Sequence, residues 1–332
     1  QLEAADYEVR RLPLWMANVT YYFDDISLNV LWIPDFEANL NPGYGSPWSS
    51  PLLPPGDEQT SHNQALLDNR TNFAGDRVLQ TERPDWTHLS DHQFAMRADI
   101  SSGALSWGLI YYYAWERDAA SYITGRFTDA GGEHLIITPS HERIHHFGVT
   151  SDYAWVATGV PFVGNLPMVF RAEALYTKDA HFVDYTKRAA IRAGGSGDGI
   201  SEHDTLRAAL AFEFAFPSKV TVIFQPSFYY TADWHEGLGV GFGGAIADEW
   251  NFAPVVFISR PVQSTRDRLL LSATLTPYLS GPNRAYPGGK VRLVARYEFS
   301  PFPSGRFIYP RYTVGDVDAL FAQYAPYANL GT

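Results

Sequence analysis

Residues 206–216 read LRAALAFEFAF, and in an extended chain their side chains divide into an apolar and a polar set. Leu206, Leu210 and Phe214 fall on one side, whereas Arg207 and Glu213 fall on the other, because successive residues of a strand point in opposite directions. Similar segments recur along the 332-residue chain, joined by connections that are short, then long, then short again. This pattern predicts an all-β fold, an antiparallel transmembrane β-barrel with an apolar outside and a polar inside.

We expect twelve strands in this sequence, at 13–23, 26–34, 92–100, 104–116, 141–155, 167–177, 204–216, 219–231, 252–260, 265–277, 290–299 and 306–313. Long loops are predicted at 35–91, 117–139, 178–203 and 232–251, with a connection of middling length at 156–166. Strands of a soluble β-sandwich average about five or six residues, and a loop as long as 35–91 is uncommon in a compact soluble domain. These two features favour the barrel over the sandwich.

The alternation of short and long connections also predicts whether further strands precede and follow this sequence. If the short turns face the periplasm, the first strand starts and the last strand ends on the extracellular side, whereas the termini of such barrels ordinarily lie in the periplasm. Bacterial single-chain barrels have an even number of strands. We therefore expect residues 1–332 to form one outer-membrane barrel domain that lacks N-terminal strands and the last strand, with at least fourteen strands in the intact barrel. The loop 35–91 either folds into the pore or caps the extracellular side.

Composition narrows the classes of function. The absence of cysteine excludes disulfides, thiolate metal sites and cysteine nucleophiles. A net charge of -11 argues against a nucleic-acid partner. The aromatic content of 15% suits the interfacial girdles of a membrane barrel, and also a carbohydrate-binding sheet.

Charged residues at alternate strand positions form the candidate functional set, because charges are costly toward lipid and should line the lumen. The predicted pore-lining residues are Arg97, Asp99, Arg171, Glu173, Arg207, Glu213, Arg268, Arg292, Arg296 and Glu298, with Lys219 beside them. A positive excess would select anions. The alternative is a lattice of arginine–carboxylate pairs that braces the wall.

The segment His141-Glu142-Arg143-Ile144-His145 matches the HExxH zinc motif, which requires a helix. Pro139 before it and the alternating residues after it predict a strand instead, where the two imidazoles lie about 13 Å apart. We therefore expect no metal, no cofactor and no enzymatic activity at this motif. The segment 194–204, GGSGDGISEHD, lacks the spacing of an EF-hand and is predicted to be a flexible loop, with calcium binding as the alternative.

Several stretches resemble the Gram-negative outer-membrane barrel family catalogued as domain of unknown function 1302. They are RLPLWMANVTYYF at 11–23, LWIPDFEANLNPGYGSPW at 31–48, RIHHFGVTSDYAW at 143–155, FRAEALY at 170–176, DTLRAALAFEFAFPS at 204–218 and DALFAQY at 318–324. The resemblance implies a channel or transporter in the bacterial outer membrane, and no catalytic residues. It also implies hydrophobic cargo, and as partners a periplasmic lipid-carrier-like protein and an inner-membrane exporter.

The sequence thus predicts a porin-like outer-membrane protein that passes small organic or hydrophobic solutes, with selectivity from the inward Arg and Glu residues and an infolded loop. Three alternatives stay open at this point. One is a surface binding or adhesion protein that uses 35–91, and the second is a barrel-borne zinc or acyl hydrolase, although no GxSxG motif occurs. The third is a soluble carbohydrate binder with an aromatic surface.

Overall fold

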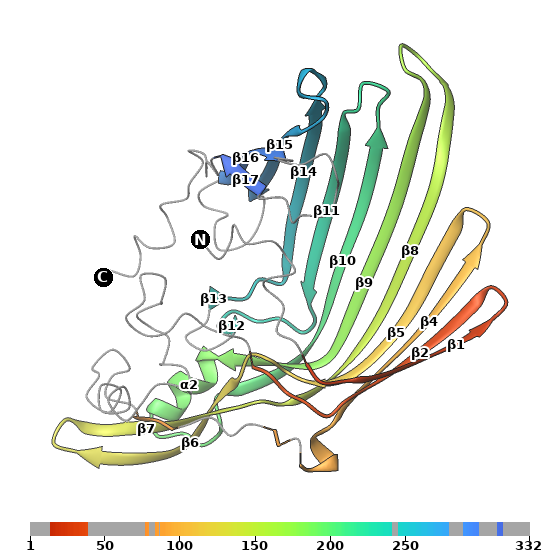
Figure 1. Ribbon diagram of the computed structural model, residues 1–332. Helices are drawn as coiled ribbons and strands as arrows, with labels where there is room; N and C mark the ends of the chain where they lie inside the picture. The colour runs from red at the N-terminus through yellow and green to blue at the C-terminus, as the bar shows by residue number, and fades with distance from the viewer. Residues whose placement is uncertain are drawn as a thin grey trace.

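The main feature of the fold is one large antiparallel sheet (Figure 1). The computed structural model describes residues 14–38, 77–79, 84–85, 87–240, 245–278, 288–298 and 311–314. The strands follow one another in the order β1-β2-β4-β5-β8-β9-β10-β11-β14-β15-β16-β17, so each pairs with its neighbour in this path. Their bounds are Ala17–Phe23, Ile26–Ile33, Gln93–Ser102, Leu105–Trp115, Arg143–Val160, Gly164–Asp184, Ile200–Ala215, Thr221–Thr231, Trp250–Val262, Leu269–Tyr278, Gly288–Glu298 and Arg311–Val314.

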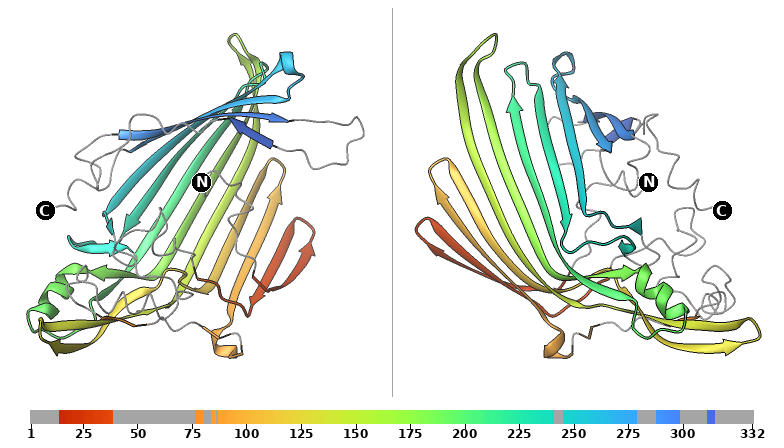
Figure 2. Two further views of the ribbon diagram at one scale, coloured as in Figure 1. Left: turned by 60° about the vertical axis from the view of Figure 1, so that its left-hand side comes forward. Right: turned by 180° about the vertical axis from the view of Figure 1, so that it is seen from behind.

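Each of the twelve predicted strands overlaps one strand of this path, so the all-β prediction and the strand order are confirmed. The sheet is strongly curved (Figure 2). Among the described strands, β1 pairs only with β2 and β17 only with β16, so the sheet has two open edges. Closure into a barrel therefore stays a prediction.

The short and long connections lie at opposite ends of the strands (Figure 1). The short ones are tight turns, as at Asp24, which has a φ of 39°, or three-residue elements such as the 3-10 helix η5 (Gln263–Thr265). The long ones carry the remaining structure: β3 (Arg77–Val78), the 3-10 helix η4 (Leu89–Asp91), β6 (Ala120–Asp129), β7 (Gly132–Ser140), α2 (Tyr185–Arg192), β12 (Leu238–Val240) and β13 (Ala245–Ile246). We call this side the long-connection end.

Three predicted loops were wrong. Residues 117–139 form the β6–β7 hairpin, which extends by β3 into a separate three-stranded sheet. Most of 156–166 belongs to β8 and β9, which continue to Val160 and resume at Gly164. In 178–203, β9 runs on to Asp184, α2 follows, and β10 already begins at Ile200.

Local chemistry explains these elements. The β6–β7 turn is held by the Asp129 carboxylate, whose Oδ1 accepts the Gly131 N–H at 2.7 Å, a common device of Asp in tight turns. Helix α2 begins after Asp184, whose side chain accepts the Lys187 N–H at 3.0 Å as an N-cap. The described residues contain no helix long and apolar enough to cross a membrane.

The twelve-stranded sheet has one continuous apolar face. Cross-strand register places on it, from β4 to β11, Phe94, Met96, Leu109, Tyr111, Phe147, Val149, Tyr153, Phe170, Ala172, Tyr176, Leu206, Ala208, Leu210, Phe212, Phe224 and Phe228. Many of these side chains are well exposed: Leu109 is 48% and Phe147 47% accessible. In the described part of this face, charged residues lie only near its margins, at Arg260 toward the short turns and at Arg143, Lys178 and Asp204 toward the long-connection end.

The buried core lies away from this face. Among the described residues, the buried apolar clusters are Ala180, Phe182, Leu238 and Ala247, then Ala120, Val183 and Ile200, and finally Ile123, Leu135 and Ile191. All three join the ends of β9 and β10, α2 or the β6–β7 hairpin at the long-connection end. A soluble domain would bury the apolar face of its large sheet under a second layer, and in the described part of the chain no second sheet covers it.

Candidate functional site: the polar face of the sheet

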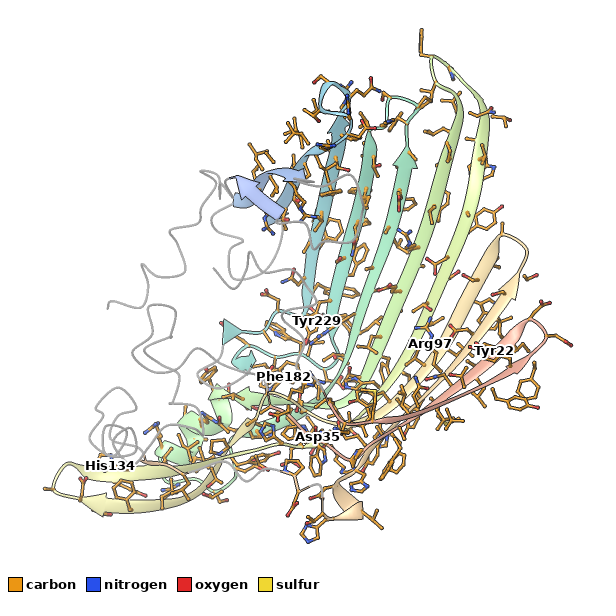
Figure 3. The ribbon with its side chains drawn as sticks, viewed as in Figure 1. Tyr22, Asp35, Arg97, His134, Phe182 and Tyr229 are labelled. Carbon is orange, nitrogen blue, oxygen red and sulfur yellow. The ribbon has the colours of Figure 1, made fainter. Side chains whose placement is uncertain are left out.

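The opposite face of the sheet is polar, and its side chains form rows that cross the strands. One row, the Glu173 row, contains Asp99, Gly108, Thr150, Glu173, Ala209, Ser227 and Ala253. The next, the Arg207 row, contains Arg97, Ile110, Gly148, Leu175, Arg207, Tyr229 and Asn251. Figure 3 labels Arg97 and Tyr229, which lie in the same row on β4 and β11.

Two groups of ion pairs brace this face. Arg97 Nε lies 2.8 Å from Asp99 Oδ1 on the same strand. Arg171 joins three strands, because its Nε lies 3.2 Å from Asp152 on β8 and its Nη1 2.8 Å from Glu213 on β10. All these groups are partly exposed, so each pair contributes only about 0–1 kcal/mol to stability. Their geometry corresponds to the bracing lattice for Arg97, Asp99, Arg171 and Glu213.

Glycine makes room for one of these pairs. A Cβ on Gly108 would lie 2.8 Å from Asp99 Oδ1 and 2.9 Å from Thr150 Oγ1. The Asp99 carboxylate therefore lies over the Gly108 backbone, which a larger residue would displace. This close approach explains a buried glycine in the middle of a strand, where glycine is otherwise unfavourable.

An open hollow of about 550 Å³ lies between these ion pairs and the long-connection end. Its lining comes mainly from the Glu173 and Arg207 rows, over β5, β8, β9, β10, β11 and β14. The floor is low where the residues are small, at Gly148, Ala209, Ser227 and Ala253. Larger side chains border this floor, so the hollow follows from the order of small and large residues along two rows.

Two charged residues of the hollow stand apart from the ion pairs. Arg207 and Glu173 have no ion-pair partner within 4.0 Å among the described side chains. The Arg207 guanidinium instead lies over the ring of Tyr229, with Cζ 5.3 Å from the ring centroid, within the ~6 Å reach of a cation–π contact. Leu175 and Ala209 are their cross-strand neighbours, and both are uncharged. The hollow thus holds an accessible cation and an accessible anion beside apolar surface.

The next row toward the long-connection end closes the hollow on that side. It contains Ala95, Tyr112, His146, Thr177, Thr205 and Thr231. Thr177, Thr205 and Thr231 are buried, at 6%, 3% and 0% exposed. The polar face is therefore accessible up to the Arg207 row and covered beyond it.

The structure places the other predicted pore-lining residues as follows. Arg292 and Arg296 lie on the polar face, paired in the ladder with Thr274 and Leu270 of β15. Glu298 pairs with Arg311 in the backbone ladder, and its side chain lies outside the described part. Arg268 was predicted within a strand, which is wrong: it lies in the turn before Leu269, because η5 and the left-handed residues Arg266 and Asp267 delay the start of β15.

Lys219 also lies in a turn rather than in a strand, since β11 begins at Thr221. It has a positive φ of 59°, and its Nζ pairs with the Asp267 carboxylate of the neighbouring short turn. It therefore links two turns at the end of the sheet.

A histidine with a buried side chain links β9, β10 and the segment that follows β5 at the long-connection end. His181 on β9 is 8% exposed at its side chain; its Nδ1 lies 3.3 Å from Glu116 and its Nε2 3.8 Å from Glu202. Burial of the imidazole acts to lower its pKa, but the nearby carboxylates of Glu116, Glu142 and Glu202 outweigh burial and raise it. The charged imidazolium is thus the stabilising form.

This arrangement predicts a loss of stability as the pH rises above the ordinary pKa of histidine. Because the folded pKa of His181 is raised, its contribution is fully present below the unfolded value of about 6.5 and is lost as the pH rises through the folded value. We expect proteolysis of the β6–β7 region to accelerate over that range in the wild type, and His181→Gln to lack this acceleration. An equal pH dependence in both proteins, measured by limited digestion, would contradict the assignment.

A second buried group, Asp184, connects four segments. It is 2% exposed, it caps α2, its Oδ2 accepts the Ser201 hydroxyl at 2.7 Å, and it lies 3.3 Å from His235 Nε2. Burial raises its pKa, but the hydrogen bonds from Lys187 and Ser201 and the charge of His235 outweigh burial and lower it. The carboxylate is therefore ionised at neutral pH.

The HExxH segment is extended, as predicted. His141 precedes β8, is 6% exposed, and its Nδ1 lies 2.8 Å from the Glu116 carbonyl oxygen. His145 lies on the apolar side of β8, with Nδ1 2.9 Å from the Tyr111 hydroxyl and its ring stacked on Tyr113. Within the described ranges, no group of three His, Cys, Asp or Glu side chains could hold a metal ion.

In the segment 194–204, Asp198 Oδ1 accepts the Ile200 N–H at 3.0 Å, and β10 begins at Ile200.

Sequence reasoning missed the uncharged lining of the hollow, including Ile110, Leu175, Tyr229 and Asn251. Alternation alone assigns them to the polar face, but only the register between strands places them beside Arg207. The prediction that the loop 35–91 folds into the pore or caps the extracellular side falls mostly outside the described residues. Of this loop, the structure describes only 35–38, 77–79, 84–85 and 87–91.

These features define the class of protein at the level that the fold supports: an all-β protein built on a twelve-stranded antiparallel sheet with an apolar and a polar face. No family model, no curated protein and no solved structure matches the chain.

Proposed function

We propose that the apolar face contacts the hydrocarbon of a lipid bilayer, and that the sheet is part of the wall of an outer-membrane β-barrel. The protein passes small organic or hydrophobic solutes along the polar face without covalent chemistry. The observation that carries this proposal is the apolar face itself, which is exposed across the sheet and, among the residues that the structure describes, bears charge only near its margins.

The distribution of aromatic residues supports contact with a bilayer. One band near the long-connection end includes Trp32, Phe94, Tyr111, Phe147, Tyr176, Tyr230 and Trp250, and another toward the short turns includes Tyr153, Trp155, Phe170, Phe212 and Phe224. The segment from Phe147 to Trp155 spans about 26 Å at ~3.3 Å per residue. A strand tilt of ~40° reduces this to about 20 Å, close to the ~25 Å apolar band of membrane barrels.

The polar face supports a passage for solutes. Its charged side chains are accessible, with Arg97 46% and Asp99 37% exposed, rather than buried under a second layer. Charges in the middle of a strand need water or one another as partners. A water-filled lumen would hydrate these charges, and the ion pairs of Arg97 and Arg171 provide partners of opposite charge.

The resemblance to the outer-membrane barrel family points in the same direction. It supports location in the bacterial outer membrane, hydrophobic cargo, and assembly with a periplasmic lipid-carrier-like protein and an inner-membrane exporter. The partners are proposed on this resemblance alone. The passage of solute is proposed on the polar face and does not depend on the partners.

Reconstitution of the full chain into planar bilayers tests the proposal. We expect a steady conductance and, in a salt gradient, a reversal potential that favours anions, because the described polar face bears Arg97, Arg171, Arg207, Arg292 and Arg296 against four carboxylates, those of Asp99, Asp152, Glu173 and Glu213. Heat-denatured protein added in the same way is the control. No conductance would overturn the passage, and cation preference would overturn the anion selectivity.

A further inference from the structure

The hollow on the polar face differs from the rest of that face in its chemistry. Elsewhere the charges of β4, β8, β9 and β10 are paired, as in Arg97–Asp99 and Arg171–Glu213. In the hollow, Arg207 and Glu173 lie in adjacent rows on neighbouring strands but more than 4.0 Å apart. A wall that only needed bracing would pair them as it pairs the others.

The Arg207 side chain is oriented so that its N–H donors can bind an anion. Its guanidinium lies over the Tyr229 ring, a contact that orients the side chain without using its N–H donors. A guanidinium presents two parallel donors that match a carboxylate, sulfonate or phosphate. Glu173 in the next row disfavours a second negative charge on the same ligand, because like charges repel at such short range.

The remaining lining suits an apolar body. Ile110, Leu175, Ala209 and Ala253 supply aliphatic surface, while Ser227 and Asn251 add uncharged polar groups at the β11–β14 side. The volume of about 550 Å³ lies within the ~300–1,000 Å³ range of small-molecule sites. The row of buried threonines, with Thr231 0% exposed, closes the hollow on the side of the long-connection end. A solute that enters the hollow is held against this row.

We propose that this hollow binds a monoanionic amphiphile, one acidic group on an apolar body, with the acid held by Arg207 and the body by Leu175, Ile110 and the alanines. The inference rests on the proposed function, since it requires that solutes reach the polar face, and it names the class of solute. Arg207 makes the hollow prefer anionic ligands, and Glu173 disfavours ligands that carry more than one negative charge.

Calorimetric titration of the full chain in detergent micelles tests the site with three probes of one shape: 3-phenylpropionate, 3-phenylpropanol and 3-phenylpropylamine. We expect the acid to bind at least tenfold more tightly than the alcohol or the amine. Arg207→Gln should remove this preference, and Glu173→Gln should strengthen binding of the acid several-fold. Arg97→Gln, a change of the same type in the same row but outside the hollow, should leave the affinity unchanged.

A second variant keeps the charges and fills the space. Ala209→Leu places a branched side chain on the floor, and we expect it to weaken binding of the acid at least tenfold while circular dichroism stays that of a β-protein. Equal affinity for all three probes, or full affinity in Arg207→Gln or Ala209→Leu, would overturn the site.

Flux of the same probes into proteoliposomes separates this inference from the proposed function. Selective binding without any flux would reject the passage and retain the site. Flux that is the same in the wild type and Arg207→Gln, together with unselective binding, would reject the site and retain the passage.

Discussion

Ala208→Arg is expected to lower the free energy of unfolding of the lipid-embedded protein by about 2–4 kcal/mol, the cost of arginine near the middle of the lipid-facing side of a barrel. Ala208 lies on the apolar face, paired with Ala174 on β9 and Phe228 on β11, between the two aromatic bands. A guanidinium there finds no carboxylate among its cross-strand neighbours and would have to reach one of the distant margins.

The adjacent residue supplies the control. Ala209 lies on the polar face directly opposite Glu173, so Ala209→Arg gains a potential ion-pair partner and faces water. We expect its free energy of unfolding to stay within about 0.5 kcal/mol of the wild type, as for ordinary surface substitutions. Urea titrations of both variants in lipid vesicles measure the difference.

This comparison separates the two environments that the sheet could have. If water bathed both faces, the two arginines would cost about the same, and equal stabilities would contradict the membrane assignment. If lipid covers one face, only Ala208→Arg is harmful. The test does not depend on whether the sheet closes into a barrel.

The strands could be predicted because one-sided burial imposes a period of two on residue polarity, and β10 keeps that period from Leu206 to Phe214. The β6–β7 hairpin was missed because a register shift between Ile123 and Gly125 interrupts the alternation, although the Gly131-Gly132 turn was a signal for it. Helix α2, at eight residues, is too short for a convincing helical period; its N-cap Asp184 and the following glycines were the available signal.

The hollow could not be predicted for a different reason. Alternation assigns Arg207 and Glu173 to the polar face, but it contains no information on which residues of other strands lie beside them. That information is the register, which follows from turn geometry and from packing at strand ends. The depth of the hollow depends on Gly148, Ala209 and Ser227 lying together on three strands, a coincidence visible only in space.

The second large effect is expected at the long-connection end, for Asp184→Ala. Removal of this buried carboxylate leaves the Lys187 N–H without its cap, and leaves Ser201 and His235 without the group that they contact at 2.7 and 3.3 Å. Loss of an N-cap costs about 0.5–2 kcal/mol, and a covered hydroxyl left without its acceptor costs about 1–3 kcal/mol, which together give roughly 3 kcal/mol. That figure corresponds to about a hundredfold increase in the population of the locally opened state.

Hydrogen exchange of the α2 amides, residues 185–192, measures this opening directly. We expect Asp184→Asn to show a smaller increase, because an amide oxygen can still accept the Lys187 N–H but carries no charge toward His235. Glu236→Ala, which removes an exposed carboxylate beside His235, serves as the matched control and should leave exchange unchanged. Unaltered α2 exchange in Asp184→Ala would mean that packing around Phe182 and Leu238 holds this end of the sheet without the carboxylate. The expected increase would instead make Asp184 the group that couples α2 to β9 and β10, and hence to the buried row that closes the hollow.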